Sequence, residues 1–284
     1  MTNKPKPDKY SAVWVSHSSM GDFIKCPRAY YLHNIYKNPT TNRKMNIVTP
    51  ATSLGSAVHE VLEGLINFKA EDREKQSLTG QYEEVWPKYA GKNGGFLDKE
   101  TEAEYKERGL VMLDRVKKNF GPLKNKAIKL KEHEGGMPPN YYLSEDDNII
   151  LCGLIDWLEY LPETDSLHVL DFKTGKHEEK EGSLQLPIYL LLLSNLQKRS
   201  VTKASYWYLG DKDKPEEKPL PTLEEARKRV LKVAKEVKEA RLKNDFKCPR
   251  GSEGCFACTP FEKILKGEAE YVGVGGYGQD IYLV

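Results

Sequence analysis

Two acids and one lysine near the middle of the chain have the types and spacing that could do chemistry. Asp171 and Lys173 follow a mostly apolar run at 167–170 and come just before a Thr-Gly turn, which is the pattern of a buried strand that ends in charge. Because side chains alternate along a strand, Asp171 and Lys173 share one face, whereas Phe172 points to the other. The sequence therefore predicts an acid and an amine held side by side at the end of a strand.

The second acid, Asp156, lies inside the preceding apolar run at 148–161, and residues 162–166 have the composition of a turn. If the hairpin is centred between Glu163 and Thr164, Asp156 faces Asp171 across the ladder, where Cβ atoms are roughly 5 Å apart and like charges destabilise. A shared proton could relieve the repulsion, but we favour a divalent cation held by oxygen ligands. The alternatives are a solvated Asp156 at a frayed strand end, or a register shifted by one residue.

These segments resemble the PD-(D/E)XK nuclease superfamily and, within it, the RecB-like branch. GLIDWLEYL followed by VLDFKTG is similar to the two central motifs of that branch, an aspartate on one strand and D-x-K with a trailing T-G on the next. QLPIYLLLL is similar to its Q-x-x-x-Y helix, LGSAVHEVLE to its G-x-x-x-H helix, and SHSSMGDFIKCPRAYYL to its opening segment. The matches follow the family's order and cover most of the chain.

The resemblance implies a metal-dependent DNA nuclease, specifically an exonuclease acting on DNA ends or single strands. Its cofactor would be Mg²⁺ or Mn²⁺, and an imidazole ligand would make Mn²⁺ bind comparatively well. The implied metal ligands are His59, Asp156, Asp171 and the carbonyl of Phe172. Lys173 would orient or help deprotonate the attacking water, and Gln185 and Tyr189 would position the substrate or the lysine. Without the resemblance, His59 is a polar neighbour of an apolar helix stripe, Gln185 a helix-start residue and Tyr189 a core residue.

Four of the five cysteines extend the resemblance to RecB-like nucleases of the CRISPR-adaptation and AddB types, which hold an iron–sulfur cluster with one N-terminal and three C-terminal cysteines. The corresponding residues are Cys26, Cys248, Cys255 and Cys258. Four thiolates are what a [4Fe–4S] cluster takes. The spacing C-x6-C-x2-C departs from the family's usual order, because the close pair comes last. A structural zinc site and a metal-free protein therefore stay open. Cys152, inside the apolar run, is predicted to be a small core residue.

Composition describes a globular protein, with 39% hydrophobic and 30% charged residues in 284. No apolar run reaches membrane-spanning length, so we expect no membrane association. The first ten residues lack the apolar core of a signal peptide, so we expect a cytoplasmic location without a disulfide framework. A net charge of +2 and a pI near 8.1 permit nucleic-acid binding without arguing for it. Nothing in the sequence identifies a protein partner.

The predicted fold is α/β, with a central mixed β-sheet flanked by helices in a restriction-endonuclease-like core. We expect one domain over residues 1–284, with a helical insertion at about 69–125 and a C-terminal cysteine module at about 245–265. Predicted helices cover residues 16–32 (capped by Ser18 or Ser19 and interrupted at Pro27), 54–68, 101–120, 183–198 (capped by Ser183) and 222–243 (opened by a Thr222 and Glu225 capping box). Predicted strands cover residues 127–134, 148–161, 167–173 and 203–210. Glu132 or Glu134 is a candidate accessory acid.

Two other classes of function compete with a nuclease. The first is a catalytically inactive nucleic-acid-binding or assembly subunit with the same fold, and the second is a structural metal-binding protein. A decayed site usually lacks one of its essential groups, whereas Asp156, Asp171 and Lys173 are all present. A structural role would explain the cysteines but would leave the two strand-borne acids without a purpose.

Overall fold

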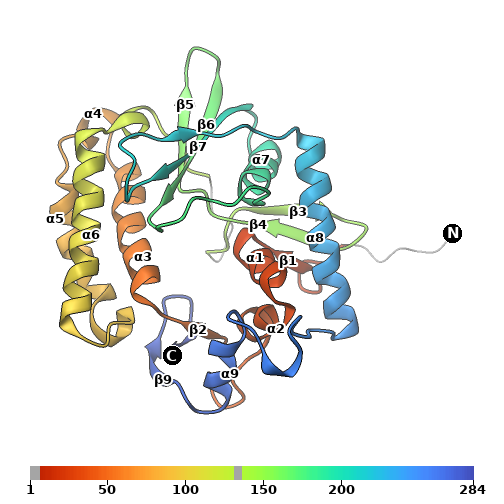
Figure 1. Ribbon diagram of the computed structural model, residues 1–284. Helices are drawn as coiled ribbons and strands as arrows, with labels where there is room; N and C mark the ends of the chain where they lie inside the picture. Colours follow the sequence, from red (N-terminus) through yellow and green to blue (C-terminus); the bar gives the residue numbers. More distant parts are fainter. Residues whose placement is uncertain (1–6, 131–135) are drawn as a thin grey trace.

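The computed structural model describes residues 7–130 and 136–284, and a four-stranded mixed sheet lies at its centre (Figure 1). The strands, hydrogen-bonded in this order, are β5 (Trp157–Leu161), β6 (Ser166–Lys173), β7 (Val201–Tyr208) and β8 (Glu216–Glu217). β6 runs antiparallel to β5 and parallel to β7. With helices on both faces, this arrangement confirms the predicted α/β class.

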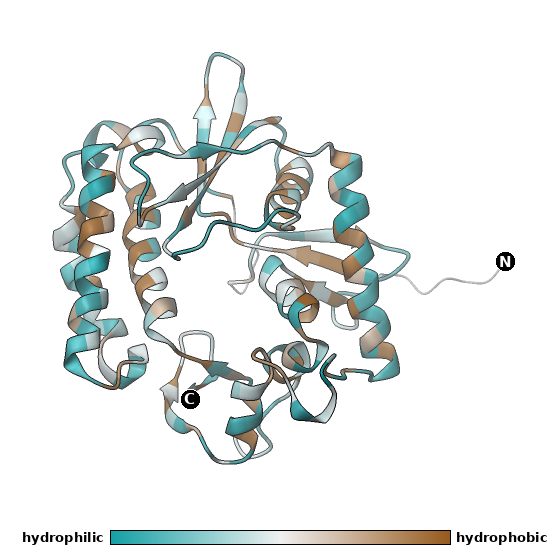
Figure 2. Cartoon of the chain, in the orientation of Figure 1, coloured by the Kyte–Doolittle hydropathy of each residue, from teal (hydrophilic) through white to brown (hydrophobic). Residues whose placement is uncertain are grey.

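Each face of the central sheet packs against its own set of helices. On one face, Leu167 and Val169 of β6 share a core with α7 (Gln185–Leu196) and α8 (Leu223–Lys243). On the other face, Leu170 and Phe172 share a core with α3 (Pro50–Gly64), α5 (Leu78–Val85) and α6 (Lys99–Lys118). Figure 2 shows apolar residues along α7 and the central strands, and mostly hydrophilic ones on α6 and α8. A slip of β6 by one residue would exchange the two buried sets, so its register is fixed.

Two three-stranded sheets and several short helices complete the described chain. The first sheet has the order β1 (Val13–Val15), β4 (Ile149–Cys152), β3 (Asn140–Ser144), and the second has the order β2 (Met45–Ile47), β10 (Asp280–Leu283), β9 (Glu270–Val274). The remaining α-helices are α1 (His17–Lys25), α2 (Pro27–Tyr30), α4 (Ala70–Arg73) and α9 (Thr259–Leu265). Short π or 3-10 helices cover Tyr31–Ile35, Leu65–Asn67, Trp86–Tyr89, Gly91–Gly94, Gly121–Lys124 and Gly251–Glu253. Within residues 7–130 and 136–284, none of the helices has the length and apolar character needed to cross a bilayer.

The predicted first helix is two helices, and the predicted break is confirmed. Cys26 separates α1 from α2 in an extended conformation, and Pro27 begins α2. Proline has no N–H to donate, so it can open a helix but not continue one without losing a hydrogen bond. The predicted cap, Ser18 or Ser19, is wrong: Ser16 caps α1, and its Oγ accepts the Ser19 N–H at 3.2 Å. Ser19 Oγ in turn accepts the Ser16 backbone N–H, so the two residues form a capping box.

The apolar run at 148–161 is not one strand, as predicted, but two strands in different sheets. β4 pairs with β1 and β3, whereas β5 pairs with β6. Between them, Gly153 passes so close to α7 that an added Cβ would lie 3.1 Å from Leu192 Cδ1. Both strands are largely buried, so the run shows no alternation of polar and apolar residues that would reveal where the chain changes sheet.

Two predicted helix starts also differ from the structure. α3 begins four residues earlier, at Pro50, and ends at Gly64, because Thr49 caps it with Thr52 as the partner of a capping box. α7 begins at Gln185, so Ser183 does not occupy the cap position, although its Oγ accepts the Gln185 N–H at 3.2 Å. The capping box of Thr222 and Glu225 at the start of α8 is confirmed.

The predicted strand at 127–134 is not formed in its described part. Ala127 makes an isolated bridge with Glu159, and residues 128–130 belong to no strand. Residues 131–134, with the candidate acids Glu132 and Glu134, lie outside the described residues. Conversely, β2, β9 and β10 lie in segments for which no strand was predicted.

Candidate active site

The hairpin register brings the two predicted aspartates together. Trp157 pairs with Leu170, and Leu161 pairs with Ser166, so the hairpin is centred between residues 163 and 164, as predicted. Asp156 immediately precedes β5, and continuing the register by one residue places it opposite Asp171 of β6. The predicted opposition of the two carboxylates is therefore confirmed, and the alternative of a register shifted by one is wrong.

Asp171 is the buried centre of a hydrogen-bonded group that includes both predicted residues of α7. Its side chain is 2% exposed, and its Oδ1 accepts hydrogen bonds from Gln185 Nε2 at 2.6 Å and from the Tyr189 hydroxyl at 2.8 Å. Gln185 Nε2 also lies 3.0 Å from the Tyr189 oxygen, because residues four apart share a helix face. Burial and the charge of Asp171 raise the pKa of Tyr189 well above its usual value, so this hydroxyl stays a neutral donor.

Lys173 lies between two carboxylates and one amide oxygen. Its Nζ is 2.9 Å from Asp171 Oδ2 and 3.3 Å from Glu179 Oε2, and it donates a hydrogen bond to Gln185 Oε1. Burial acts to lower the pKa of Lys173, but the negative charges of Asp171 and Glu179 outweigh it and raise the pKa. Lys173 therefore stays protonated at neutral pH, which suits charge stabilisation better than proton abstraction.

Asp156 and His59 meet at the backbone of Phe172. Asp156 Oδ2 accepts the Phe172 N–H at 2.8 Å, and His59 Nε2 donates to the Phe172 carbonyl at 3.0 Å. The other ring nitrogen of His59, Nδ1, lies 3.5 Å from Asp156 Oδ2. The structure therefore brings His59 of α3 to the end of β6, together with Asp156 and the predicted carbonyl ligand.

Glu63 is a further acid of this site that the sequence reasoning missed. Its Oε1 lies 3.2 Å from His59 Nδ1, and the side chains are one turn apart on α3. The signal was present in the sequence as a histidine followed four residues later by a glutamate, a spacing that places both on one helix face. Sequence alone did not separate Glu63 from the many other charged residues of the helices.

The close approach of α3 to the end of β6 depends on a glycine. An added Cβ at Gly55, one turn before His59, would lie 3.2 Å from Thr174 Oγ1. Contacts this short are tighter than most side-chain contacts in proteins, so a larger residue would require Thr174 to shift. Gly55 is the glycine of the G-x-x-x-H pattern, and its place in the structure gives that pattern a physical reason.

The protonation states of Asp156 and His59 reflect the crowding of acids around them. Burial and the negative charge of Asp171 raise the pKa of Asp156 to about 7. Burial alone would lower the pKa of His59, but the hydrogen bond to Glu63 and the charge of Asp156 raise it to about 9. Both ring nitrogens of His59 face oxygen acceptors, so the ring is an imidazolium here, and its positive charge offsets the nearby carboxylates.

A divalent cation fits this set of groups. Ligand atoms of His59, Glu63 and Asp156 all lie within 4.8 Å of one another. Across the site, Asp171 Oδ2 is buried and has the Lys173 ammonium 2.9 Å away. A carboxylate oxygen can accept from more than one partner, so this atom can also approach a cation. Several carboxylates with one imidazole suit Mg²⁺ or, better, Mn²⁺.

A second group, of four thiols, joins the two ends of the chain. The Sγ atoms of Cys26, Cys248, Cys255 and Cys258 all lie within 4.8 Å of one another, and all five cysteines of the chain are free. Cys26 lies between α1 and α2, and Cys258 immediately precedes α9. Cys26 and Cys258 are almost fully buried, at 0% and 1% exposure. Cys152, by contrast, lies apart from this group, on β4, with its thiol 3.5 Å from the Val15 carbonyl.

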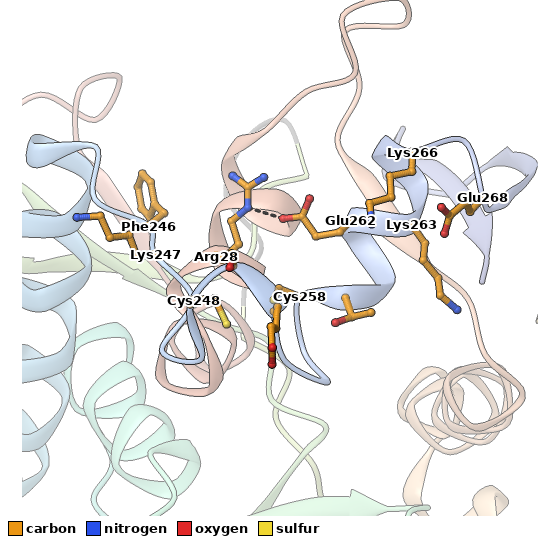
Figure 3. A pocket seen from close by; sticks show the side chains of 14 residues that line it. Arg28, Phe246, Lys247, Cys248, Cys258, Glu262, Lys263, Lys266 and Glu268 are labelled. Carbon is orange, nitrogen blue, oxygen red and sulfur yellow. Dashed lines mark hydrogen bonds and ion pairs between the residues drawn. The ribbon is translucent and has the colours of Figure 1, made fainter.

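Figure 3 shows a pocket that is lined by two of the four cysteines, Cys248 and Cys258. A cavity of about 670 Å³ lies beside Cys248 and Cys258. Arg28 of α2 donates to Glu262 of α9 at 2.6 Å, which is a second link between the same two segments. The cavity is lined mainly by polar and charged side chains, and it contains none of the acids of the Asp171 site.

A mixed α/β fold with paired acids beside a lysine at one strand end is compatible with a metal-dependent nuclease. The chain belongs to the PD-(D/E)XK nuclease superfamily, whose family model matches residues 14–260. Comparison with curated proteins found no match. The predicted superfamily and the predicted restriction-endonuclease-like fold are thereby confirmed, and nucleic acid is the substrate that the family implies. The RecB-like branch is not distinguished by this match and stays a prediction.

Proposed function

We propose that this protein is a RecB-like DNA nuclease that degrades DNA exonucleolytically from ends or single strands. The observation that supports it most directly is the arrangement at the end of β6, where Asp156 and Asp171 face each other beside Lys173. Each of these three residues has a role in nuclease chemistry. The branch, the preference for DNA and the exonucleolytic mode come from the resemblance of the sequence motifs.

In this proposal, the ion is held by His59, Asp156, Asp171, the Phe172 carbonyl and Glu63. When bound, a divalent cation activates a water molecule near neutral pH and stabilises charge on the phosphate. Lys173, as a buried ammonium, orients that water and counters the negative charge that develops on the phosphate. Gln185 and Tyr189 hold Asp171 from α7, and Gln185 also accepts a hydrogen bond from Lys173. These two residues are positioning residues rather than ligands.

An inactive nucleic-acid-binding subunit is the competing proposal. In an inactive subunit, no catalytic role would require the two acids and the lysine to interact. All three nevertheless take part in buried interactions around the end of β6. A buried like-charge pair costs stability, so a protein without catalysis would gain by losing one member. The retained pair therefore favours the active enzyme.

The test is incubation of end-labelled single-stranded, double-stranded and circular DNA with the protein, in Mn²⁺, in Mg²⁺ and in EDTA. Loss of label from linear DNA, with circular DNA intact, is expected in Mn²⁺ and not in EDTA. Lys173→Ala should abolish it, whereas Lys75→Ala, at an exposed lysine paired with Asp72, should not. Cleavage that persists in Lys173→Ala, or an inactive wild-type protein, would contradict the proposal. Cleavage of circular DNA would reject the exonucleolytic mode alone.

We further propose that the four cysteines bind a metal centre that fastens α1 and α2 to the C-terminal segment. The resemblance favours a [4Fe–4S] cluster. One zinc ion is the alternative, because four sulfurs at about 2.3 Å from it would lie about 3.8 Å apart, and the Cys255 and Cys258 sulfurs are 3.8 Å apart. Iron and sulfide in anaerobically purified, brown protein would support the cluster, and colourless protein with one zinc per chain would support the alternative. Protein without either metal would refute both.

A further inference from the structure

The glycine-rich turn between β9 and β10 presents an exposed aromatic ring next to the acids of the active site. Tyr277 lies in this turn, residues 275–279, and is 86% exposed. Gly278, which follows it, has φ of +75°, a conformation that favours glycine. The two strands lie at the bottom of the view in Figure 1, near the end of the chain, and β10 pairs with β2, which leads into α3.

Two hollows of the surface meet at Tyr277. One, of about 280 Å³, is lined by Tyr277 together with Glu63 and Asp156 of the active site, and its apolar wall includes Ile66 and Ile155. The other, of about 520 Å³, has a polar wall that includes Asn46, Asn93, Lys88 and Gln279. Tyr277 therefore lies between a hollow that joins an apolar wall to the acids and a second hollow that leads away from them.

The base of the turn is anchored by a buried acid. Asp280, the first residue of β10, is 0% exposed and accepts hydrogen bonds from Thr41 and, at 3.4 Å, from Asn38 Nδ2. Arg43 lies 3.6 Å from the same carboxylate. A buried acid with these partners fixes the end of the turn.

We propose that Tyr277 is a stacking platform for an unpaired nucleobase of single-stranded DNA whose phosphate lies at the Asp156 site. An exposed aromatic ring beside an apolar wall is costly in water but suits the face of a base. The hollow next to the acids, at about 280 Å³, is slightly smaller than the roughly 300–1,000 Å³ of typical small-ligand pockets, which suits one base rather than a base pair. A paired base has both of its faces covered by its neighbours, so the subsite selects single strands or frayed ends. The proposal rests on the proposed nuclease function and specifies its substrate.

The test is a double-mutant cycle between protein and DNA. Binding of a fluorescent single-stranded oligonucleotide is measured by anisotropy with Mn²⁺ in a Lys173→Ala background, which keeps the DNA intact. A second oligonucleotide of equal length carries abasic sugars, so it keeps the phosphates but not the bases. Tyr277→Ala should weaken binding of the normal oligonucleotide about 5- to 150-fold. It should leave binding of the abasic oligonucleotide unchanged.

Control variants separate stacking from other roles of the turn. Tyr277→Phe and Tyr277→Trp keep an aromatic face and should bind within a fewfold of the parent. Tyr10→Ala removes a tyrosine that is equally exposed, at 89%, but precedes β1, and should have no effect. Equal losses for both oligonucleotides, or no loss for either, would overturn the stacking platform. If cleavage that depends on Lys173 is observed while the stacking test fails, only the stacking proposal is refuted. A wild-type protein that neither binds nor cleaves DNA refutes the stacking proposal and the nuclease proposal together.

Discussion

Replacing Lys173 with methionine keeps most of the side-chain volume but removes the ammonium that lies 2.9 Å from Asp171. The Asp171 carboxylate is 2% exposed, and breaking a buried ion pair from one side typically costs about 3–5 kcal/mol. The low end, about 3 kcal/mol, is expected here, because Gln185 and Tyr189 still donate to Asp171 Oδ1. Activity should fall about a hundredfold or more, which corresponds to ~2.7 kcal/mol of transition-state stabilisation.

Stability and activity of Lys173→Met are measured separately, by urea unfolding and by cleavage of labelled DNA. Because the lost positive charge faces the acids, Mn²⁺ should restore part of the stability of the variant but not its activity. Lys75→Met is the matched control: Lys75 is 71% exposed and pairs with Asp72, so its loss should leave the stability nearly unchanged. A variant as stable as the wild type, or one that cleaves within a fewfold of it, would refute the reasoning about Lys173.

Three further predictions follow from the same geometry. Glu63→Gln should weaken Mn²⁺ binding about 10- to 100-fold in a calorimetric titration, as loss of a ligand or of a ligand's partner does, and unchanged affinity would exclude Glu63 from the metal site. The affinity for Mn²⁺ should rise from pH 6 to pH 9, because ligands bind metal only after losing their protons and the pKa values are about 7 for Asp156 and about 9 for His59. Titrations in buffers of different ionisation enthalpy should detect the released protons. A pH-independent affinity would contradict these protonation states. Cys26→Ser should release the bound metal and lower the melting temperature, whereas Cys152→Ser, outside the four-cysteine group, should retain the metal, and equal metal loss in both would contradict the assignment.

The central hairpin was predictable because every local signal in it agrees. The turn composition at 162–166 fixed the centre of the hairpin, and strict alternation along β6 then placed Asp171 and Lys173 on one face. The contact between Gln185 and Tyr189 likewise needs only the geometry of one helix, because residues four apart share a helix face. Interactions that depend on one or two neighbouring elements can therefore be derived from residue types and spacing.

The parts that could not be predicted depend on contacts between distant segments. Nothing local distinguishes the strand that ends at Cys152 from the one that begins at Trp157, because their difference is the sheet that each joins. Glu63 is one of many charged residues on helices until α3 packs against the end of β6. The position of Tyr277 depends on the pairing of β10 with β2, more than 200 residues away, so no local signal could place it.

Phe172 explains why the acid and the lysine must be separated by one residue. Its side chain, 2% exposed, packs into the core beneath α3, and its ring contacts that of His59 edge-on at 5.9 Å. Its N–H holds Asp156, and its carbonyl accepts from His59. The side chains of Asp171 and Lys173 therefore face α7, whereas the backbone between them hydrogen-bonds a side chain of α3. An insertion or deletion of one residue between them would put the acid and the amine on opposite faces of the sheet. It would therefore break the contacts that bring groups from both helical layers together at the end of β6.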